Sequence, residues 1–331
     1  MVELTRQLIE KLKSYNRVGV FSHIRPDGDC IGAQVATCLW LEANGVQVYA
    51  FNDDDVPLNL KWLSSYHPIE KTSPELMAQC EAFIVLDGNS PARFGEVFEE
   101  YVAQYDPPRF MIDHHPEPSS HGFDLVISVD TASSTCELIY HLFKENDIDQ
   151  LSEKAAKALY TGLLTDTGSL QYDSVTPKTM KVASNLLLHG QFRPNEVAEK
   201  VFANKRKEQL QLLGRALRTI KLYQNNQIAI MYVTQDMLDS TNTTNDDCGG
   251  FVAYPLSISG IKAAILFKDL GKGIKMSLRS KSDVDVNIWA RKLDGGGHKK
   301  ASGAWHPGPL ETAIEEVVAI GAKQILSKQD A

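Results

Sequence analysis

The amino-acid sequence predicts an α/β protein in which a mostly parallel-sheet domain is joined by a helical linker to a smaller α/β domain. Three observations support this fold class. Short apolar runs alternate with amphipathic helical patterns in the first half, a densely charged stretch follows, and strand patterns return after Asn225. We place the first domain at residues 1–190, the linker at 191–222 and the second domain at 223–331.

The first domain is predicted from alternating strand and helix patterns. Strands are expected at residues 18–22, 46–51, 82–86, 109–112 and 125–129, and helices at 31–43, 134–144, 153–164 and 177–190. This βαβ rhythm is typical of a mostly parallel sheet with helices on both faces. In such sheets, ligands bind at the carboxyl ends of the strands.

The linker and the second domain have different patterns. The stretch KRKEQLQLLGRALR has dense charge and a narrow apolar face, which indicates a connecting helix. Beyond it, strands are expected at residues 227–233, 261–267 and 274–279, and helices at 284–293 and 310–325. The second domain is therefore predicted to be a smaller α/β unit.

Composition narrows the class of protein. The chain has 331 residues, of which 43% are hydrophobic and 23% charged, with a net charge of −8. No apolar run approaches the roughly 18 residues of a membrane span, and charges run through the N-terminal helix pattern, so neither a membrane anchor nor a signal peptide is expected. The five cysteines form no C-x-x-C pair, which favours a reducing cytoplasm. The acidic charge argues against an extended surface for long duplexes but leaves room for a small anionic substrate.

Polar clusters occur where the predicted elements end. Taken singly, each has an ordinary structural explanation as a turn, a helix cap or surface histidines. Those explanations do not account for their common position at one edge of the sheet. The clusters are FSHIRPDGDCIGA with His23, Asp27 and Asp29, FIVLDGN with Asp87, MIDHHPE with Asp113, His114 and His115, and GLLTDTGS with Asp166 at the end of a helix.

The charge of this predicted edge points to metal ions. Asp27, Asp29, Asp87 and Asp166 would repel one another if brought close together, and two divalent cations offset their formal charge. Mixed imidazole and carboxylate ligands suit manganese, iron, cobalt or zinc better than calcium or magnesium. Two such ions about 3.5–4 Å apart can activate a bridging hydroxide and clamp a phosphoryl group. We therefore predict metal-assisted phosphoester hydrolysis.

These four clusters resemble the motifs of the DHH phosphoesterase superfamily, named after the Asp-His-His run seen here at residues 113–115. The second half is similar to the DHH-associated C-terminal domain through KMSLRSK at 275–281 and GGGHKKASGA at 295–304. The resemblance covers nearly the whole chain and is closest to the bacterial nanoRNase and pAp-phosphatase branch. It implies two divalent metal ions, with manganese expected, and the hydrolysis of short RNA and of nucleotides.

The resemblance also implies a role for each residue of the first domain. One metal would be held by His23, Asp27 and Asp87, and the other by Asp29, Asp87, His114 and Asp166, with Asp87 bridging. His115 would face the scissile phosphate as a catalytic and substrate-binding residue, and Asp113 would orient a neighbour. Ser134 and Thr135 are expected to start a helix, and the family resemblance also allows them to line the site.

In the second domain, the run GGGHKK follows a predicted helix. Gly295 suits the C′ position of that helix, whereas the further glycines, Gly296 and Gly297, suggest backbone amides that approach a ligand closely. Arg279 can grip a phosphate in bidentate fashion. The resemblance implies that Arg279 and His298 hold the terminal phosphate or sugar of a nucleotide, which would favour short substrates.

The function expected from the sequence is an Mn²⁺-dependent exonuclease that degrades short single-stranded RNA to mononucleotides and removes the 3′-phosphate of pAp (3′-phosphoadenosine 5′-phosphate). A phosphodiesterase for linear dinucleotides, a RecJ-type exonuclease for single-stranded DNA and a non-catalytic nucleotide-binding protein stay open as alternatives. The GGGH run argues against a family II pyrophosphatase. No obligate protein partner is evident, and the sequence leaves a homodimer open.

Overall fold

The computed structural model describes residues 2–118 and 122–327, and the chain divides into two compact units, Met1–Asn204 and Lys205–Ala331. This division falls within the predicted linker, residues 191–222. Helix α8 (Pro194–Phe202) packs against α6 (Glu153–Asp166) in the first unit, whereas α9 (Lys207–Leu217) packs against α10 (Gln235–Thr241) in the second. The linker segment is thus largely helical, but its two helices belong to different units.

The predicted α/β class is confirmed. In the described part of the first unit, parallel strands form a sheet in the order β3-β2-β1-β4-β5-β6. All five predicted strands are present, and the short β3 was not predicted. The strands are β1 (Arg17–Ser22), β2 (Gln47–Phe51), β3 (Ile69–Glu70), β4 (Ala82–Leu86), β5 (Arg109–Asp113) and β6 (Leu125–Ser128).

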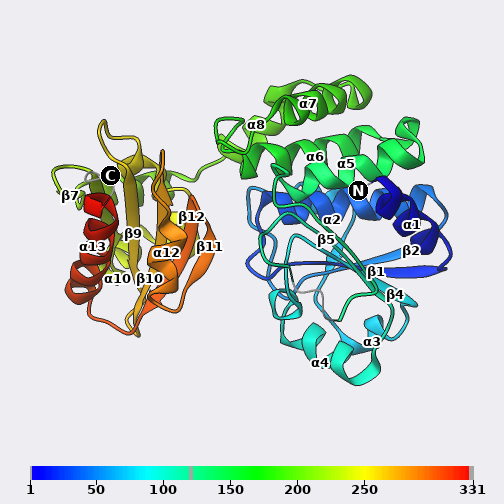
Figure 1. Ribbon diagram of the computed structural model, residues 1–331, viewed down its shortest axis with the longest axis horizontal. Coiled ribbons are helices and arrows are strands. Elements are labelled where there is room, and N and C mark those ends of the chain that lie inside the picture. The colour runs from blue at the N-terminus through cyan, green and yellow to red at the C-terminus, as the bar shows by residue number, and fades with distance from the viewer. Residues whose placement is uncertain (1, 119–121, 328–331) are drawn as a thin grey trace. The chain divides into compact units, whose positions relative to one another are not determined.

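Helices cover both faces of this sheet (Figure 1). Val18 and Val20 of β1 point into the larger core under α1, α2 and α5, while Phe21 points the other way into a core rich in phenylalanine with Phe98 of α4. This alternation follows from the two-residue period of a strand. The helices are α1 (Val2–Lys13), α2 (Gly28–Ala43), α3 (Pro74–Met77), α4 (Glu96–Tyr105), α5 (Thr135–Asn146), α6 and α7 (Pro177–Gly190).

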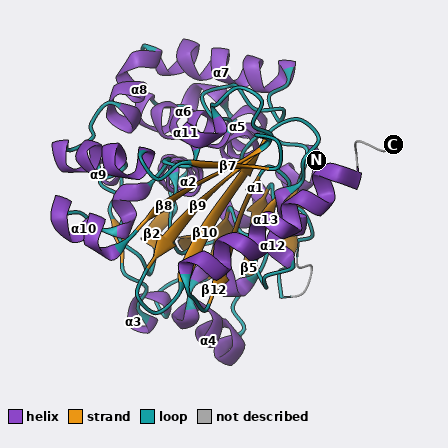
Figure 2. Cartoon of the chain, turned by 90° about the vertical axis from the view of Figure 1, so that its left-hand side faces the viewer, coloured by secondary structure: helices purple, strands orange, loops and turns teal. Residues whose placement is uncertain are grey.

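The second unit has a mixed sheet. In its described residues the strand order is β11-β12-β10-β9-β8-β7, with β8 and β9 parallel and the other neighbours antiparallel. Figure 2 shows α9 and α10 on one side of this sheet and α12 and α13 on the other. The elements are β7 (Lys221–Tyr223), β8 (Ile228–Val233), β9 (Ala263–Asp269), β10 (Ile274–Ser280), β11 (Gly296–His298), β12 (Ala301–His306), α11 (Ala253–Leu256), α12 (Val286–Arg291) and α13 (Leu310–Ser327).

Two local expectations differ from the structure of the second unit. Residues 221–223 form strand β7 rather than the end of a helix, and residues 296–298 form the edge strand β11. Gly295 does not have the left-handed conformation of a C′ residue; that conformation is adopted by Asp294, with φ 52°. Gly295 is instead required by packing, because a Cβ there would lie 2.3 Å from the Gly303 carbonyl oxygen.

Two further findings bear on composition. All five cysteines are free in the structure. No helix within residues 2–118 and 122–327 combines the length and the apolar character needed to cross a membrane.

Candidate metal centre

The predicted residues of the first unit meet because three neighbouring strands end level with one another. The β1 residue Ser22 is in register with Leu86 of β4, which in turn is in register with Ile112 of β5. The next residue on each strand is His23, Asp87 and Asp113, respectively. The parallel direction of the strands therefore delivers an imidazole and two carboxylates to one edge of the sheet.

The DGD segment both caps a helix and faces the site. Asp27 is the N-cap of α2, and its Oδ1 accepts hydrogen bonds from the backbone N–H groups of Asp29 at 3.0 Å and Cys30 at 3.1 Å. Its other oxygen, Oδ2, lies 3.8 Å from Nε2 of His23. The ordinary interpretation of this run as a helix start is thus correct, and the same residue still presents a donor atom to the site.

Asp87 lies between two groups of side chains, one around His23 and the other around His114. Its Oδ2 is 3.4 Å from Nε2 of His23, and its Oδ1 is 3.6 Å from Nε2 of His114. The residue is 2% exposed and has a left-handed backbone with φ 60°, a conformation that aspartate tolerates better than most residues. One carboxylate therefore offers an oxygen atom to each group.

The second group surrounds His114. Its Nε2 lies 3.3 Å from Oδ2 of Asp166 and 3.8 Å from Oδ2 of Asp29. Asp29 is held in place by the start of α5, where the N–H groups of Thr135 and Cys136 donate to its two oxygens at 2.6 and 2.9 Å. Helix α6 brings Asp166 to this group from its last turn.

Backbone carbonyls orient the two histidines. Nδ1 of His23 lies 2.8 Å from the carbonyl oxygen of Ile24, and Nδ1 of His114 lies 3.3 Å from that of Ala132. An Nδ1–H that donates to a carbonyl leaves the lone pair on Nε2, which is the atom that faces the carboxylates. Both imidazoles are therefore held in the tautomer that a metal ligand needs.

The donor set fits two divalent ions. Most of the imidazole-to-carboxylate separations, 3.3 to 3.8 Å, are longer than ordinary hydrogen bonds. Separations of this length are expected when both donor atoms bind the same metal ion through bonds of about 2.0–2.2 Å. Donor atoms of Asp29, Asp87 and His114 all lie within 4.8 Å of one another. His23, Asp27 and Asp87 would hold one ion, and Asp29, Asp87, His114 and Asp166 the other.

Protonation in the metal-free centre follows from burial and charge. Burial, and then the charge of Asp87, raise the pKa of Asp29 to about 7. Burial lowers the pKa of His114, but the nearby carboxylates, Asp87 first, outweigh this and raise it to about 9. Without metal, the centre thus binds protons that a divalent cation must displace.

We expect Mn²⁺ affinity to rise with pH for this reason. Because the pKa of His114 is raised from 6.5 to about 9, protonation of this residue stabilises the metal-free folded state. The stabilisation is complete below about pH 6.5 and is lost as pH rises through about 9. Between about pH 6.5 and 9, the apparent affinity for Mn²⁺ should therefore increase by roughly tenfold per pH unit for each proton that the metal displaces. Calorimetric titrations with Mn²⁺ at several pH values, in buffers of different ionisation enthalpy, measure both quantities. Affinity that is independent of pH, with no proton released, contradicts this account.

His115 and Asp113 form a separate pair beside the centre. Nδ1 of His115 lies 2.7 Å from Oδ1 of Asp113, which is fully buried. The other oxygen of Asp113 accepts no hydrogen bond from any residue that the structure describes. The carboxylate therefore orients the His115 ring.

Several contacts at the centre were not predicted or were left undecided. Ser134 caps α5, as expected, while the Thr135 hydroxyl donates to Oδ1 of Asp87 at 2.9 Å. The Asn52 amide donates to the backbone oxygen of His23 at 2.9 Å and so fixes the loop after β1. Asn52 directly follows β2, so the strand-end argument applied to that strand would have found it. The Cys30 sulfur lies within 4.8 Å of the donor atoms of His23 and Asp27. The position of Cys30 in the sequence, directly after Asp29, did not indicate this proximity.

Three candidates of the second unit, Arg279, Gly296 and His298, share one face of its sheet. Arg279 of β10 and His298 of β11 are both in register with Ala301 of β12, which lies between them. Gly297 has φ 138°, and a Cβ there would lie 2.6 Å from the Ala301 carbonyl oxygen, so the fold itself requires this glycine. Gly296 has nothing within 4 Å of its Cβ direction, and its lack of a side chain is not explained by packing.

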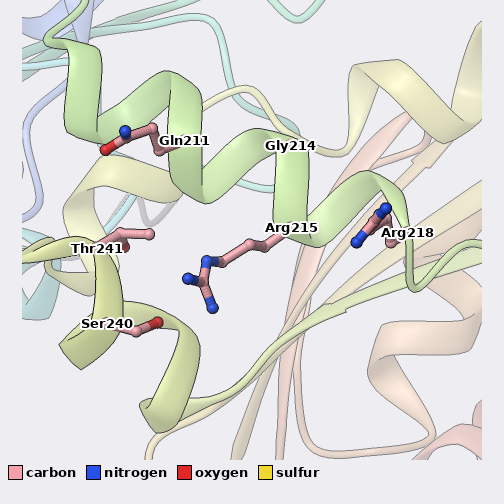
Figure 3. A pocket seen from close by; sticks show the side chains of 6 residues that line it. All are labelled: Gln211, Gly214, Arg215, Arg218, Ser240 and Thr241. Atoms are coloured by element: carbon pink, nitrogen blue, oxygen red, sulfur yellow. The ribbon is translucent and has the colours of Figure 1, made fainter.

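A pocket of about 380 Å³ lies elsewhere in the second unit, between α9 and α10 (Figure 3). The Arg215 side chain points from α9 toward Ser240. The predicted site residues do not line this pocket, whose walls are Gln211, Gly214, Arg215, Arg218, Ser240 and Thr241.

Comparison with known proteins identifies two domains in the chain. A model of the N-terminal domain of the DHH family matches residues 17–163, and a model of the DHHA1 domain matches residues 225–325. The chain belongs to the DHH family. The Asp113–His115 run that names the family lies within the first matched range, and Asp166 lies just beyond it. As a DHH-family protein, the chain is a metal-dependent phosphoesterase.

Relatives of this DHH-family chain match it over most of their length. It is 29% identical over 300 residues to the bifunctional oligoribonuclease and PAP phosphatase NrnA of Bacillus subtilis, covering 90% of this chain and 92% of that protein. It is 28% identical over 333 residues to the NrnA of Thermus thermophilus, covering 96% and 93%. A crystal structure of an exopolyphosphatase-related protein from Bacteroides fragilis superposes with a TM-score of 0.90 at 27% identity, covering 97% of this chain and 96% of that one.

Proposed function

We propose that this chain is a manganese-dependent exonuclease that hydrolyses short RNA oligonucleotides to mononucleotides and also removes the 3′-phosphate of pAp. The observation that carries the proposal is the placement of Asp87, whose two oxygens face His23 at 3.4 Å and His114 at 3.6 Å. A carboxylate shared by two oriented donor groups suits two ions that act on one phosphoryl group. The names of the Bacillus and Thermus relatives support RNA and pAp as the substrates.

The donor chemistry supports manganese. Each group combines imidazole nitrogen with carboxylate oxygen, a mixture that borderline transition metals accept and that magnesium and calcium take less readily. When bound, the two ions would supply a nucleophile at neutral pH and neutralise negative charge on the phosphoryl oxygens.

The protein's own residues would position the phosphate and move a proton. Nδ1–H of His115 donates to Asp113, so a protonated His115 can donate from Nε2 to a phosphate oxygen or to the leaving oxygen. Asp113 stabilises the imidazolium in this role. Thr135 holds Asp87 in place through its hydroxyl and so preserves the carboxylate's orientation.

The distribution of charge supports the second unit as the part that takes a polyanion. Residues 205–331 contain 18 Lys and Arg against 13 Asp and Glu, whereas residues 1–204 contain 16 against 29. The second unit therefore has an excess of positive charge although the whole chain has a net charge of −8. In this unit we propose Arg279 and His298 as the grip on a terminal phosphate or sugar, with the backbone at Gly296 and Gly297 in contact with the nucleotide.

Product analysis tests the proposal. The enzyme is loaded with Mn²⁺ and given 5′-labelled RNAs of two, five and twenty-four nucleotides, with pAp in parallel. We expect rapid release of mononucleotides from the two short RNAs, slow turnover of the long one and release of phosphate from pAp. Chelation should abolish all three activities and added Mn²⁺ should restore them. Comparable turnover of the long RNA contradicts the preference for short substrates, and no hydrolysis of any RNA contradicts the proposed function.

A further inference from the structure

An exposed tryptophan stands on the same sheet face as Arg279 and His298. On β10, Ile274, Met276 and Leu278 point into the core under α12 and α13, so the residues between them point the other way. Register then places Trp305 of β12 on that other side, directly opposite Lys275. We call this side the β12 face; its members are Lys275, Ser277, Arg279, Gly296, His298, Ala301, Gly303 and Trp305.

The indole of Trp305 is held in place although it is 42% exposed. It lies against Gly273, where a Cβ would stand 2.3 Å from Cζ2 and 2.7 Å from Cε2 of the ring. Gly273 has φ 147°, a conformation that residues with a side chain rarely adopt. One part of the ring is therefore fixed by backbone, and the rest is presented to solvent in a defined orientation.

The surroundings of Trp305 carry positive charge. Lys275 is its direct cross-strand neighbour, and Lys268 of β9 is the next residue in the same row. Lys272 lies in the turn between β9 and β10, beside Gly273. A flat aromatic ring next to lysines matches the two repeating parts of a single-stranded nucleic acid, a base that stacks and a phosphate that carries charge.

The middle of the β12 face has small side chains. Ala301 lies between Arg279 and His298 in their row, Gly303 separates that row from Trp305, and the space beyond Gly296 is open to at least 4 Å. Along β12, Ala301 and Trp305 are about 13 Å apart, from the rise of about 3.3 Å per residue. A chain gripped at Arg279 and His298 can thus pass over small residues before it meets the indole.

We propose that Trp305 is a stacking platform for a base of the RNA substrate, one that belongs to a nucleotide beyond the one gripped by Arg279 and His298. Lys275 and Lys268 bind the adjoining phosphate. This inference rests on the proposed function and adds a subsite to it. The subsite serves oligonucleotides of several residues, and neither a dinucleotide nor pAp is long enough to use it.

The test is Trp305→Ala, measured with RNAs of two and five nucleotides and with pAp. Loss of one stacked base should raise KM for the five-nucleotide RNA about tenfold. The kcat for that RNA, and all constants for the dinucleotide and pAp, should stay within twofold. Trp305→Phe should restore most of the affinity because a phenyl ring still stacks. Ile288→Ala is the matched control, since Ile288 is 46% exposed on α12, which covers the opposite side of the sheet.

Binding provides an independent readout. In an Asp87→Asn background, which does not consume the RNA, titration with the five-nucleotide RNA should quench tryptophan fluorescence, and Trp305→Ala should abolish the quenching. Trp40 and Trp289 are fully buried and report little of this contact, and the half-buried Trp62 of the first unit gives the same background signal with and without Trp305.

Three outcomes overturn the platform: an unchanged KM for the five-nucleotide RNA in Trp305→Ala, an equal loss for all substrates, or no quenching. Failure of the proposed function looks different. In that case the wild-type chain hydrolyses no RNA, while the quenching experiment still decides whether Trp305 binds a base.

Discussion

Replacing Asp87 by asparagine is expected to lower kcat on RNA and pAp by at least about a thousandfold and to remove both metal ions. The amide has a similar shape, tolerates the left-handed backbone at φ 60° and can still accept the Thr135 hydrogen bond. It loses the negative charge and one of the two oxygens that face His23 and His114. The fold should survive while the shared ligand is lost. Metal content after dialysis and steady-state kinetics measure the two effects.

A matched control for this variant is Asp106→Asn. Asp106 also has a left-handed backbone, with φ 44°, but it lies at the end of α4 and its side chain is 86% exposed. It should keep full activity and full metal content. An Asp87→Asn chain that retains two manganese ions would show that Asp87 is not a shared ligand and would remove the main support for the proposed mechanism.

Gly162→Ala is expected to damage both stability and metal binding. A Cβ on Gly162 of α6 would stand 2.6 Å from Oδ1 and 2.9 Å from Cα of Asp29, and 2.3 Å from the Cys136 sulfur. Helices α2 and α5 would have to move away from α6. Such overpacking typically costs about 1–3 kcal/mol. A shift of Asp29 of the order of 1 Å should lower catalysis by roughly a hundredfold.

Two comparisons separate steric pressure on Asp29 from a general effect of alanine. Gly214→Ala on α9 has nothing within 4 Å of the new methyl group and should slightly raise stability. Adding Cys136→Ala to Gly162→Ala relieves the contact with sulfur but not the contact with Asp29. The double variant should therefore recover part of the thermal stability and little of the Mn²⁺ affinity. Full recovery of metal affinity would show that Asp29 is not displaced.

The edge of the first sheet was predictable because it depends on local rules. Strands β1, β4 and β5 have apolar sequences bounded by polar residues, and parallel strands necessarily end at the same edge. The positions of His23, Asp87 and Asp113 follow from these two facts. The DGD run was also recognisable as a helix start. Chemistry then linked the four carboxylates to divalent ions through their mutual repulsion.

Other features depend on contacts between distant segments. The GGH segment of β11 has almost no intrinsic preference for a strand, and it becomes one by pairing with β12. The stretch from Arg193 to Leu222 has a continuous helical character, yet it is divided between two units because α8 and α9 pack on different cores. Neither result could be obtained from propensity or periodicity.

The sequence by itself determined which residue types reach the edge of the first sheet and which chemistry they can perform, because strand polarity and charge are local properties. Only the tertiary structure decided that Asp87 turns one oxygen to His23 and the other to His114. The same holds for the pairing of Asp113 with His115 and for the contact of Trp305 with Gly273. These are orientations of side chains, and they are set by packing between segments that lie far apart in the chain.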